Sequence, residues 1–466
     1  ANSAVAERLP ESMRRPLVGE ALENYWMFSR MLSQTIVPSP DPAAAGGYNN
    51  KRAWLADTLQ TILLRNDGWV SVQAGLNPSI IDQCLAAEHR MEGEQANTLA
   101  SAVAVNPLGL RHEIASAVMA GAKGILVRTN SALADPISVQ TTGDRALQAA
   151  IRWCNHDLRL WSPWLIWGQS MPPPLLDRPD FAAARWRVRD ADLIIVQNVA
   201  PQSQWCLPAT RGSPLVVRLS EGISVPQAIR LTEGSMELMT TRVSAGSQEW
   251  QVDQPAPVEL FLLTHNPQVL GYVRRRLEAN SAENAADQLE IASYCAEQAS
   301  QLLDARFAAT AASSSQENRN SRMTQLQRLT AIQNRLERGW QSLQARQPQS
   351  ATAIAFEVFD LTQAIMQEGF FAATSNLTTA QSSPFVLSPG TLKYHWLVAD
   401  ACSRSQWQPV QIPGSQFTDL AEMLQGGWSQ QRRLQEIADL RVELVPGLAG
   451  GPHSLRLAAY SKSALA

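Results

Sequence analysis

Carboxylates that could do acid–base chemistry follow two short apolar runs in the first third of the chain. They are Glu88, Glu92 and Glu94 after the first run and Asp135 after the second. Two carboxylates held close together can share general acid and general base roles. Loop charges are usually solvated, so we expect these side chains to face water. No Ser-His-Asp set, nucleophile elbow or HExxH zinc motif accompanies them.

Cysteines and histidines form no metal or disulfide pattern. The five cysteines are scattered, no CxxC pair occurs, and none of the six histidines lies at metal-ligand spacing from them. We therefore expect small buried thiols and predict no metal site and no cofactor. His156, inside a predicted helix, is expected to be a packing residue and not a base.

Composition excludes several classes of protein. Hydrophobic residues make up 45% and charged residues 17% of the 466 residues, so several cores can be buried and wholesale disorder is excluded. The net charge of −3 argues against a nucleic-acid partner, because a protein that binds nucleic acid needs a basic surface. No run of about 18 apolar residues exists, so we expect no membrane span.

Residues 1–145 alternate short apolar runs with helical patterns, which is typical of βα units and a parallel sheet. The predicted strands are residues 15–18, 31–37, 68–73 and 124–128. A helix ending at Gly121 is predicted just before the last of them. Four strands fit half of a (β/α)₈ barrel better than a complete doubly wound domain. No GxGxxG or Walker loop follows any of them, which disfavours a nucleotide-dependent enzyme.

The later segments differ in period and composition. They are an exit helix and linker at 146–175, a small antiparallel β domain at 176–266, a helical hairpin or bundle at 267–374, a linker at 375–405, and the opening of a further β-sandwich at 406–466. The exit helix is predicted to run from about residue 144 to 160 and to end before Pro163. The β domain has predicted strands at 193–196, 214–219, 249–252 and 258–263. A polar break is expected at 311–320.

The two ends of the chain read as cuts. The chain opens at Ala1 without an initiator Met and closes soon after a strand-like run at 455–459. We expect a processed or partial chain, with any export signal outside it.

Four groups of residues carry a resemblance. They are AGAKGI at 120–125; NHDLRLWSPW at 155–164; LTEG at 231–234 with RVSAG at 242–246 and LLT at 262–264; and PGSQF at 413–417 with Gly427-Trp428 and HSLRL at 453–457. In this order they resemble large multidomain proteins typical of planctomycete bacteria. Those proteins carry a glycoside-hydrolase-like barrel of the β-galactosidase type, a small β domain, a helical segment and a galactose-binding-like jelly roll.

The resemblance implies a multidomain chain that is α/β, then all-β, then α. It would hold the C-terminal half of a (β/α)₈ barrel, about strands five to eight, in residues 1–145. A small antiparallel β-sandwich, a helical hairpin or bundle and the start of a truncated jelly roll would follow. Fold alone does not give function, so the site residues have to carry that argument.

The resemblance also implies where catalytic carboxylates would stand. Most glycosidases use two of them, and barrels hold them at the carboxyl ends of strands. In barrels of this type the pair is expected on strands four and seven. The fourth would precede Ala1, and the seventh ends in Gln73, whose amide can bind a sugar hydroxyl but cannot act as an acid. No catalytic residue is therefore named.

Candidate substrate-binding residues follow from the same comparison. They are Gln73, Arg128, Asn130, Asp135, Trp69 and Trp428, the last only if the jelly roll binds glycans. The alternative for those at the barrel mouth is a structural hydrogen-bond set that closes the barrel. Four tryptophans at positions 153, 161, 164 and 167 bunch near the barrel exit, and we expect them to pack at a domain interface.

Two functions stay open. The leading hypothesis is a fragment of an exported, carbohydrate-active, glycoside-hydrolase-like multidomain protein that partners a polysaccharide or glycan and does not hydrolyse glycosides by itself. The alternative is a non-catalytic envelope or extracellular scaffold or interaction protein with a degenerate barrel. Gln73 favours the alternative, whereas intact barrel acids upstream would favour the first. No prediction of linkage or oligomeric state follows.

Overall fold

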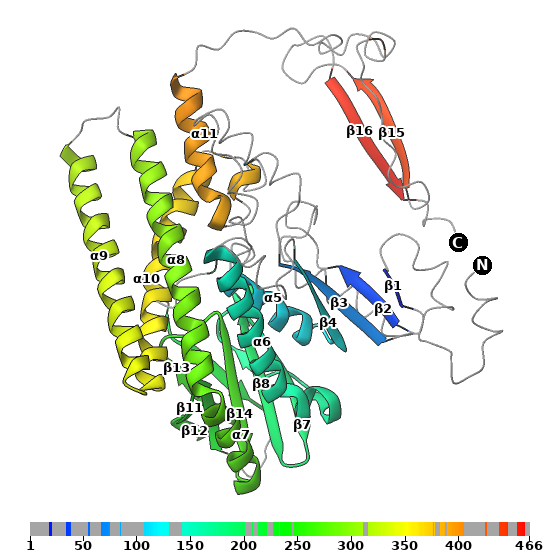
Figure 1. Ribbon diagram of the computed structural model, residues 1–466. Coiled ribbons are helices and arrows are strands. Elements are labelled where there is room, and N and C mark those ends of the chain that lie inside the picture. The colour runs from blue at the N-terminus through cyan, green and yellow to red at the C-terminus, as the bar shows by residue number, and fades with distance from the viewer. Residues whose placement is uncertain are drawn as a thin grey trace, which may run out of the picture. The chain divides into compact units, whose positions relative to one another are not determined.

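A computed structural model shows how the chain is arranged (Figure 1). It describes residues 18–20, 34–38, 55, 67–74, 84, 107–129, 142–200, 207, 213–220, 227–232, 234–244, 247–310, 316–375, 377, 383–386, 389–404, 425, 438–445 and 454–461. The chain divides into two compact units, Ala1–Ser403 and Arg404–Ala466.

A parallel sheet forms the first part of the larger unit. In the described residues its strands are β1 (Val18–Glu20), β2 (Gln34–Pro38), β3 (Asp67–Gln73) and β4 (Gly124–Arg128). They are paired in sequence order, and every pair is parallel. Right-handed crossovers place the connections of such a sheet on one face. The last two strands match the predicted runs closely, and the first two begin three residues later than predicted.

The turn from α5 (Pro107–Met119) into β4 is the one that the sequence predicts. The N–H of Gly121 donates to the carbonyl of Val118, and the N–H of Ala122 donates to that of Ala117. This pair of bonds is a Schellman motif. Gly121 has φ of 97°, a conformation that glycine adopts without strain.

Helix α6 (Thr142–Trp167) is longer than predicted, because it continues through Pro163. A proline inside a helix leaves the carbonyl four residues earlier without its usual N–H partner. Here the hydroxyl of Ser162 donates to that carbonyl, on Arg159, over 3.0 Å. The last turns of α6 also pack against the strands that follow, so the expectation that the helix ends before Pro163 was wrong.

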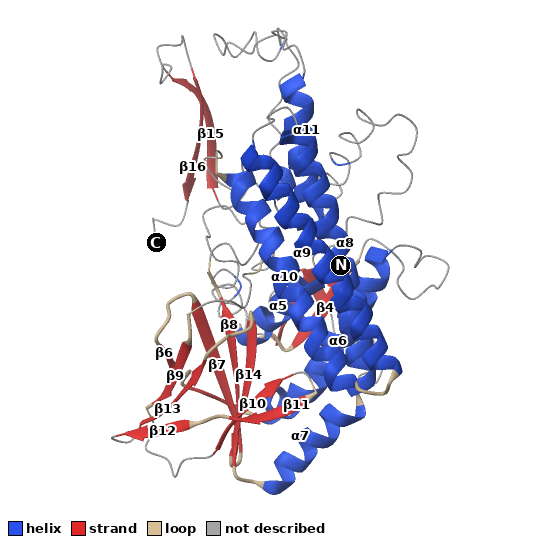
Figure 2. Cartoon of the chain, turned by 90° about the vertical axis from the view of Figure 1, so that its left-hand side faces the viewer, coloured by secondary structure: helices blue, strands red, loops and turns tan. Residues whose placement is uncertain are grey.

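Two antiparallel sheets follow (Figure 2). Within the described part of the chain, one has the order β11-β10-β14-β8-β7-β5 and the other β12-β13-β9-β6. The strands are β5 (Gln169–Met171), β6 (Leu175–Leu176), β7 (Phe181–Val188), β8 (Ala191–Asn198), β9 (Leu215–Leu219), β10 (Gln227–Thr232), β11 (Ser235–Leu238), β12 (Thr241–Ser244), β13 (Ser247–Val252) and β14 (Val258–Thr264). The predicted strands correspond to β8, β9, β13 and β14, and β5 to β7 and β10 to β12 are additional.

The larger of these sheets is buried on both faces. Ile194 and Phe261 point toward the smaller sheet and meet Trp250 there. Leu193 and Leu262 point the other way and pack with the helices. This alternation explains why every residue of β8 is buried.

Long helices complete the larger unit. They are α7 (Pro267–Ala279), α8 (Ser281–Thr310), α9 (Gln316–Gln344) and α10 (Pro348–Thr374), followed by η5 (Pro384–Val386), η6 (Pro389–Thr391) and α11 (Leu392–Arg404). Helices α8, α9 and α10 pack on one another, and α8 also lies along α6. The approach is close at Gly339 and Gly369, where a Cβ would lie 2.6 Å from a leucine methyl group of α8. No helix in the described residues is long and apolar enough to cross a membrane.

The expected linker at 375–405 contains ordered structure. It holds η5, η6 and α11, and Tyr394 is completely buried. Val386 and Leu392 join the core built by α8 and α10, which explains why this segment packs instead of linking.

The smaller unit contains, among its described residues, the antiparallel pair β15 (Ala438–Val445) and β16 (Ser454–Ser461). Strand β16 contains the strand-like run that the sequence predicts at 455–459.

Candidate functional site

The carboxyl ends of β3 and β4 bring two predicted site residues together. The register pairs Gln73 with Arg128 at the last position of both strands. The N–H of Ala74 donates to the carbonyl of Arg128 over 2.8 Å, so the pairing continues to the edge of the sheet. The side chain of Arg128 is exposed. The last paired positions of these strands are therefore occupied by a glutamine and an arginine, and neither residue is a carboxylic acid.

Trp69 lies at the other end of the same pair of strands. It is paired with Gly124, about 13 Å along the strand from Gln73. A Cβ at Gly124 would lie 2.5 Å from the indole of Trp69, so the ring packs directly on the glycine backbone. The sheet thus brings Gln73 and Arg128 together and holds Trp69 apart from them.

The other candidate residues lie outside the described residues. They are Asn130, Asp135 and Trp428, together with the loop carboxylates Glu88, Glu92 and Glu94.

The tryptophans of α6 serve mainly as packing residues. Trp153 and Trp161 are almost fully buried, and the indole N–H of Trp164 donates to the carbonyl of Ala191 over 3.0 Å. Trp167 differs, because it is 80% exposed. The burial of the first three agrees with a packing role.

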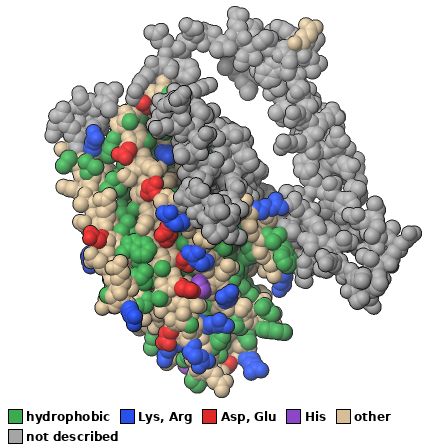
Figure 3. All heavy atoms as spheres, viewed as in Figure 1, with side chains coloured by type: hydrophobic (Ala, Val, Ile, Leu, Met, Phe, Trp, Pro, Cys, Tyr) green, Lys and Arg blue, Asp and Glu red, His purple; other side chains and the backbone are tan. Residues whose placement is uncertain are grey.

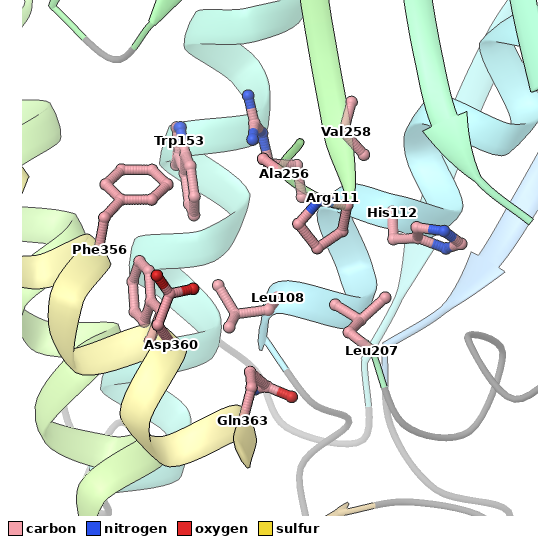
Figure 4. Close-up of a pocket in the computed structure, with 12 residues that line it drawn as sticks. Leu108, Arg111, His112, Trp153, Leu207, Ala256, Val258, Phe356, Asp360 and Gln363 are labelled. Carbon is pink, nitrogen blue, oxygen red and sulfur yellow. The ribbon is translucent and has the colours of Figure 1, made fainter. Parts of the chain in front are cut away.

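A cavity of about 50 Å³ opens where α5, α6, α10 and the segment before β14 meet (Figure 4). Its lining is mostly apolar. The residues are Leu108, Arg111, His112, Trp153, Leu207, Ala256, Pro257, Val258, Phe356, Phe359, Asp360 and Gln363. Segments about 250 residues apart in the sequence are needed to form it.

Aromatic rings form one wall of the cavity. The indole of Trp153 stacks on Phe359 with ring centroids 6.3 Å apart and meets the edge of Phe356 at 6.1 Å. The guanidinium of Arg111 lies 4.6 Å from the centre of the Trp153 ring. This cation–π contact fixes the indole between α5 and α10.

The cation of this wall is already paired. Arg111 Nε donates to Asp157 Oδ2 over 2.7 Å, and their side chains are only 10% and 8% exposed. Burial raises the pKa of the Asp157 carboxyl, although the neighbouring Arg111 opposes that rise. The pair joins α5 to α6 and leaves little free charge for a ligand.

His112 is held by the backbone of β8. Its Nε2 lies 2.7 Å from the carbonyl of Asn198, and its own carbonyl accepts from Gln197 Nε2 over 2.7 Å. Gln197 also donates to Ser116 over 2.7 Å. These bonds dock α5 on β8, so this histidine has a structural role.

Gln363 is the unusual polar residue of the lining. It is only 5% exposed, and its Oε1 has no hydrogen-bond partner among the residues that the structure describes. Asp360 lies one turn earlier on the same face of α10. Asp360 and Gln363 are the two polar residues that α10 contributes to the lining (Figure 4).

The described surface carries mixed charge. Figure 3 shows acidic and basic side chains interspersed over the visible face of the described helices and strands. One example is the pair of Arg152 Nη2 and Asp287 Oδ1, 2.5 Å apart across α6 and α8. His156 Nε2 lies 3.7 Å from Glu283 in the same row, and its largely buried ring agrees with a packing role. No metal-binding cluster of His, Cys, Asp or Glu occurs in the described part of the chain.

Sequence reasoning missed the cavity. Apolar residues at 354, 358, 361 and 365 recur at steps of three and four, which predicts a core-facing stripe on α10, and Ile354, Val358 and Ile365 are buried. A second face of the helix, with Phe356, Phe359 and Gln363, has the same helical spacing and lines the cavity. That spacing was the available signal.

Comparisons with known proteins give only weak likenesses. No family model and no curated protein matches the chain. A GH30 endoxylanase from Clostridium papyrosolvens has 9% identity and a TM-score of 0.28, over 51% of this chain and 50% of that chain. An alpha-amylase from Anoxybacillus has 11% identity and a TM-score of 0.24, over 52% and 61%. A maltogenic alpha-amylase from Thermotoga neapolitana has 10% identity and a TM-score of 0.24, over 52% and 64%.

The chain thus spans less than two thirds of each of these structures. The likeness to glycoside hydrolases is partial, and the function has to be argued from this chain's own residues.

Proposed function

We propose that this chain is part of a carbohydrate-active, glycoside-hydrolase-like protein that binds a glycan and does not cleave it alone. The observation that carries the proposal is the register of β3 and β4, which sets Gln73 beside Arg128 at the carboxyl ends of parallel strands. In barrel folds those ends form the ligand-binding face. Amide and guanidinium groups supply the donors and the acceptor that sugar hydroxyls need.

The order of the strands supports a barrel-like arrangement. A doubly wound sheet reverses its strand order, whereas β1 to β4 follow one another in a single direction. On β3, Val70 and Val72 lie in the same core as α5 and α6, and strand alternation turns Trp69 and Ser71 the other way. The packing of α5 and α6 against this one face of β3 agrees with half of a barrel.

The absence of hydrolysis is argued from Gln73. A retaining or inverting glycosidase needs two carboxyl groups, and the amide at this strand end can serve neither as acid nor as nucleophile. We therefore expect no turnover of aryl glycosides by the 466-residue chain, and none by Gln73→Glu, which adds only one carboxylate. Turnover that an active-site mutation removes would contradict this proposal.

Affinity electrophoresis against a panel of soluble polysaccharides tests glycan binding. Arg128→Ala should weaken the affinity for the retarding polysaccharide about tenfold, because it removes one charge-assisted hydrogen bond. Lys123→Ala is the matched control, because Lys123 is an exposed cation at the opposite end of β4 and should leave the retardation unchanged. Equal losses in both variants would point to non-specific charge effects.

The second candidate is a non-catalytic envelope or extracellular scaffold, and it is favoured by the same amide at Gln73. It predicts no retardation by any polysaccharide. In both cases we propose a protein of the layout seen in the planctomycete-type chains, exported from the cell. Fractionation of the source cells with an antibody against this chain would contradict export if all of the protein stayed in the cytosol.

A further inference from the structure

The cavity beside Trp153 shares no residue with the sheet edge at Gln73 and Arg128. It is concave and partly open, and its lining comes mainly from α5, α6, α10 and residues 256–258. Concave pockets with a mostly apolar lining are the usual sites for small molecules. A glycan needs polar partners for its hydroxyl groups, so the glycan proposal does not account for this cavity.

We propose that this cavity binds the end of an aliphatic chain, about four carbons long, from a ligand whose polar head stays in solvent at the mouth. The chain end lies against Leu108, Phe356 and Phe359, which all line the cavity. The ligand class is therefore an unbranched alkyl compound.

The polar residues of the lining are engaged or enclosed. Arg111 donates to Asp157, and His112 is held by the backbone of β8. The side-chain oxygen of Gln363 is fully enclosed, so a ligand in the cavity cannot reach it. What the cavity offers to a ligand is then apolar surface, which favours a hydrocarbon group over water.

The volume of the cavity selects a chain end and excludes a ring. About 50 Å³ is roughly three to five times the 10–15 Å³ that one water molecule needs. A methylene group is about as large as a water molecule, so about four carbons fill this space. A benzene ring needs more room, since an engineered cavity that holds it measures about 150 Å³. The opening lets the rest of a chain continue outside.

Ligand-observed NMR titration of the full chain with a series of 1-alkanols tests the proposal. The neutral hydroxyl head avoids repulsion by Asp360, the carboxylate of the lining. Affinity should rise about fourfold for each added methylene up to butanol or pentanol, because each one leaves water for the cavity. From pentanol to octanol it should rise less than about twofold in total, because the added carbons stay in solvent.

Three results of this titration would overturn the proposal. A uniform rise through octanol would mean that the chains adsorb on exposed apolar side chains such as Trp167. The second is the absence of saturable binding by butanol and pentanol. Cyclohexanol has the six carbons of 1-hexanol in a ring and should bind at least about fivefold more weakly, so equal binding of these two alcohols is the third.

A filling variant tests the location. Ala256 is partly buried in the lining, so Ala256→Phe should place a ring in the cavity and abolish the binding of the alkanols. Ala372→Phe is the matched control, because Ala372 is partly buried on α10 and does not line the cavity. It should bind the alkanols as the native chain does. Unchanged binding by Ala256→Phe, or equal losses in both variants, would place the chain end elsewhere and overturn the proposal.

An enlarging variant tests the size limit. Val258 is buried on β14 and lines the cavity, so Val258→Ala should move the break in the alkanol series to a chain about one carbon longer. Val252→Ala is the matched control, because Val252 is buried on β13 outside the lining and should leave the break where it is. A break at the native length in Val258→Ala would overturn the proposal.

Discussion

The sheet edge and the cavity are two candidate sites of opposite construction. Gln73 and Arg128 are brought together by backbone pairing of two neighbouring strands. The cavity is brought together by side-chain packing of α5, α6 and α10, which are distant in the sequence. The edge is polar and its Arg128 is exposed, whereas the cavity wall is aromatic and buried.

Because of this difference, a substitution at the sheet edge should change binding without changing the stability of the fold, whereas one at the cavity should change both. Backbone pairing does not depend on the side chain at a strand end, so the edge can change its chemistry while the fold persists. Cavity residues such as Arg111 and Trp153 also belong to the core. Changes there should alter stability and binding together.

The largest expected effect is protection of the Cys295 thiol from alkylation, since this residue lies in the same core as the cavity wall. Burial raises the pKa of the Cys295 thiol from 9.0 to about 12, which lowers the thiolate fraction at pH 8 about a thousandfold. Alkylation with iodoacetamide, mapped by mass spectrometry, should therefore label it only after unfolding. Rapid labelling of native protein would show that this core is open.

Breaking the ion pair of the cavity wall should have the next largest effect. Arg111→Met leaves the Asp157 carboxylate buried without its partner and should lower the free energy of unfolding by about 3 kcal/mol at pH 7. The double change Arg111→Met with Asp157→Leu should regain most of this. Urea denaturation of both variants measures the difference, and equal losses would mean that the pair is not the cause.

The same variant should respond to pH in a defined direction. Burial raises the pKa of Asp157 above its ordinary value of 3.8, so the folded state holds this proton more tightly than the unfolded state. Its contribution to stability is then present below pH 3.8 and is lost as the pH rises through the folded-state pKa. Removal of Arg111 raises that pKa further, so Arg111→Met should be closer to wild type at pH 5 than at pH 7. A deficit that is the same at both pH values would contradict this.

Removing the unpartnered acceptor should have a smaller effect and the opposite sign. Gln363→Leu replaces a buried amide whose oxygen has no partner in the described structure, and it should raise the free energy of unfolding by about 1 kcal/mol. Asn284→Leu should do the same on α8. Destabilisation by Gln363→Leu would mean that the amide is satisfied in solution.

The sheet edge should give the smallest change in stability. Arg128→Ala removes an exposed side chain and should change the free energy of unfolding by less than about 0.5 kcal/mol. Its thermal unfolding should match that of Lys123→Ala within error. A large loss at Arg128 alone would favour the structural hydrogen-bond set over a binding role.

Local signals explain which parts of the fold were predictable. The strand at 124–128 follows a glycine that ends a helix, and both features are set by nearby residues. Strand β7 was missed because Arg185 reads as a solvent-facing residue. In the structure it is buried and donates to Asp192 of β8 over 2.8 Å, a contact that exists only after the strands pair.

The candidate sites divide in the same way. The pairing of Gln73 with Arg128 follows from the order of parallel strands, which the sequence indicates. The cavity depends on how α10 rotates against α5 and α6, and a glutamine such as Gln363 on an amphipathic helix reads as exposed. Only tertiary packing buries it.

The central claim is that the carboxyl edge of β3 and β4 binds a glycan without cleaving it. The most direct test is titration of the native 466-residue chain with the polysaccharide that retards it most, compared with Arg128→Ala and Lys123→Ala. The account predicts saturable binding, about tenfold weaker in Arg128→Ala and unchanged in Lys123→Ala, with no release of reducing sugar. Equal binding by all three proteins, or hydrolysis by the native chain, would contradict it.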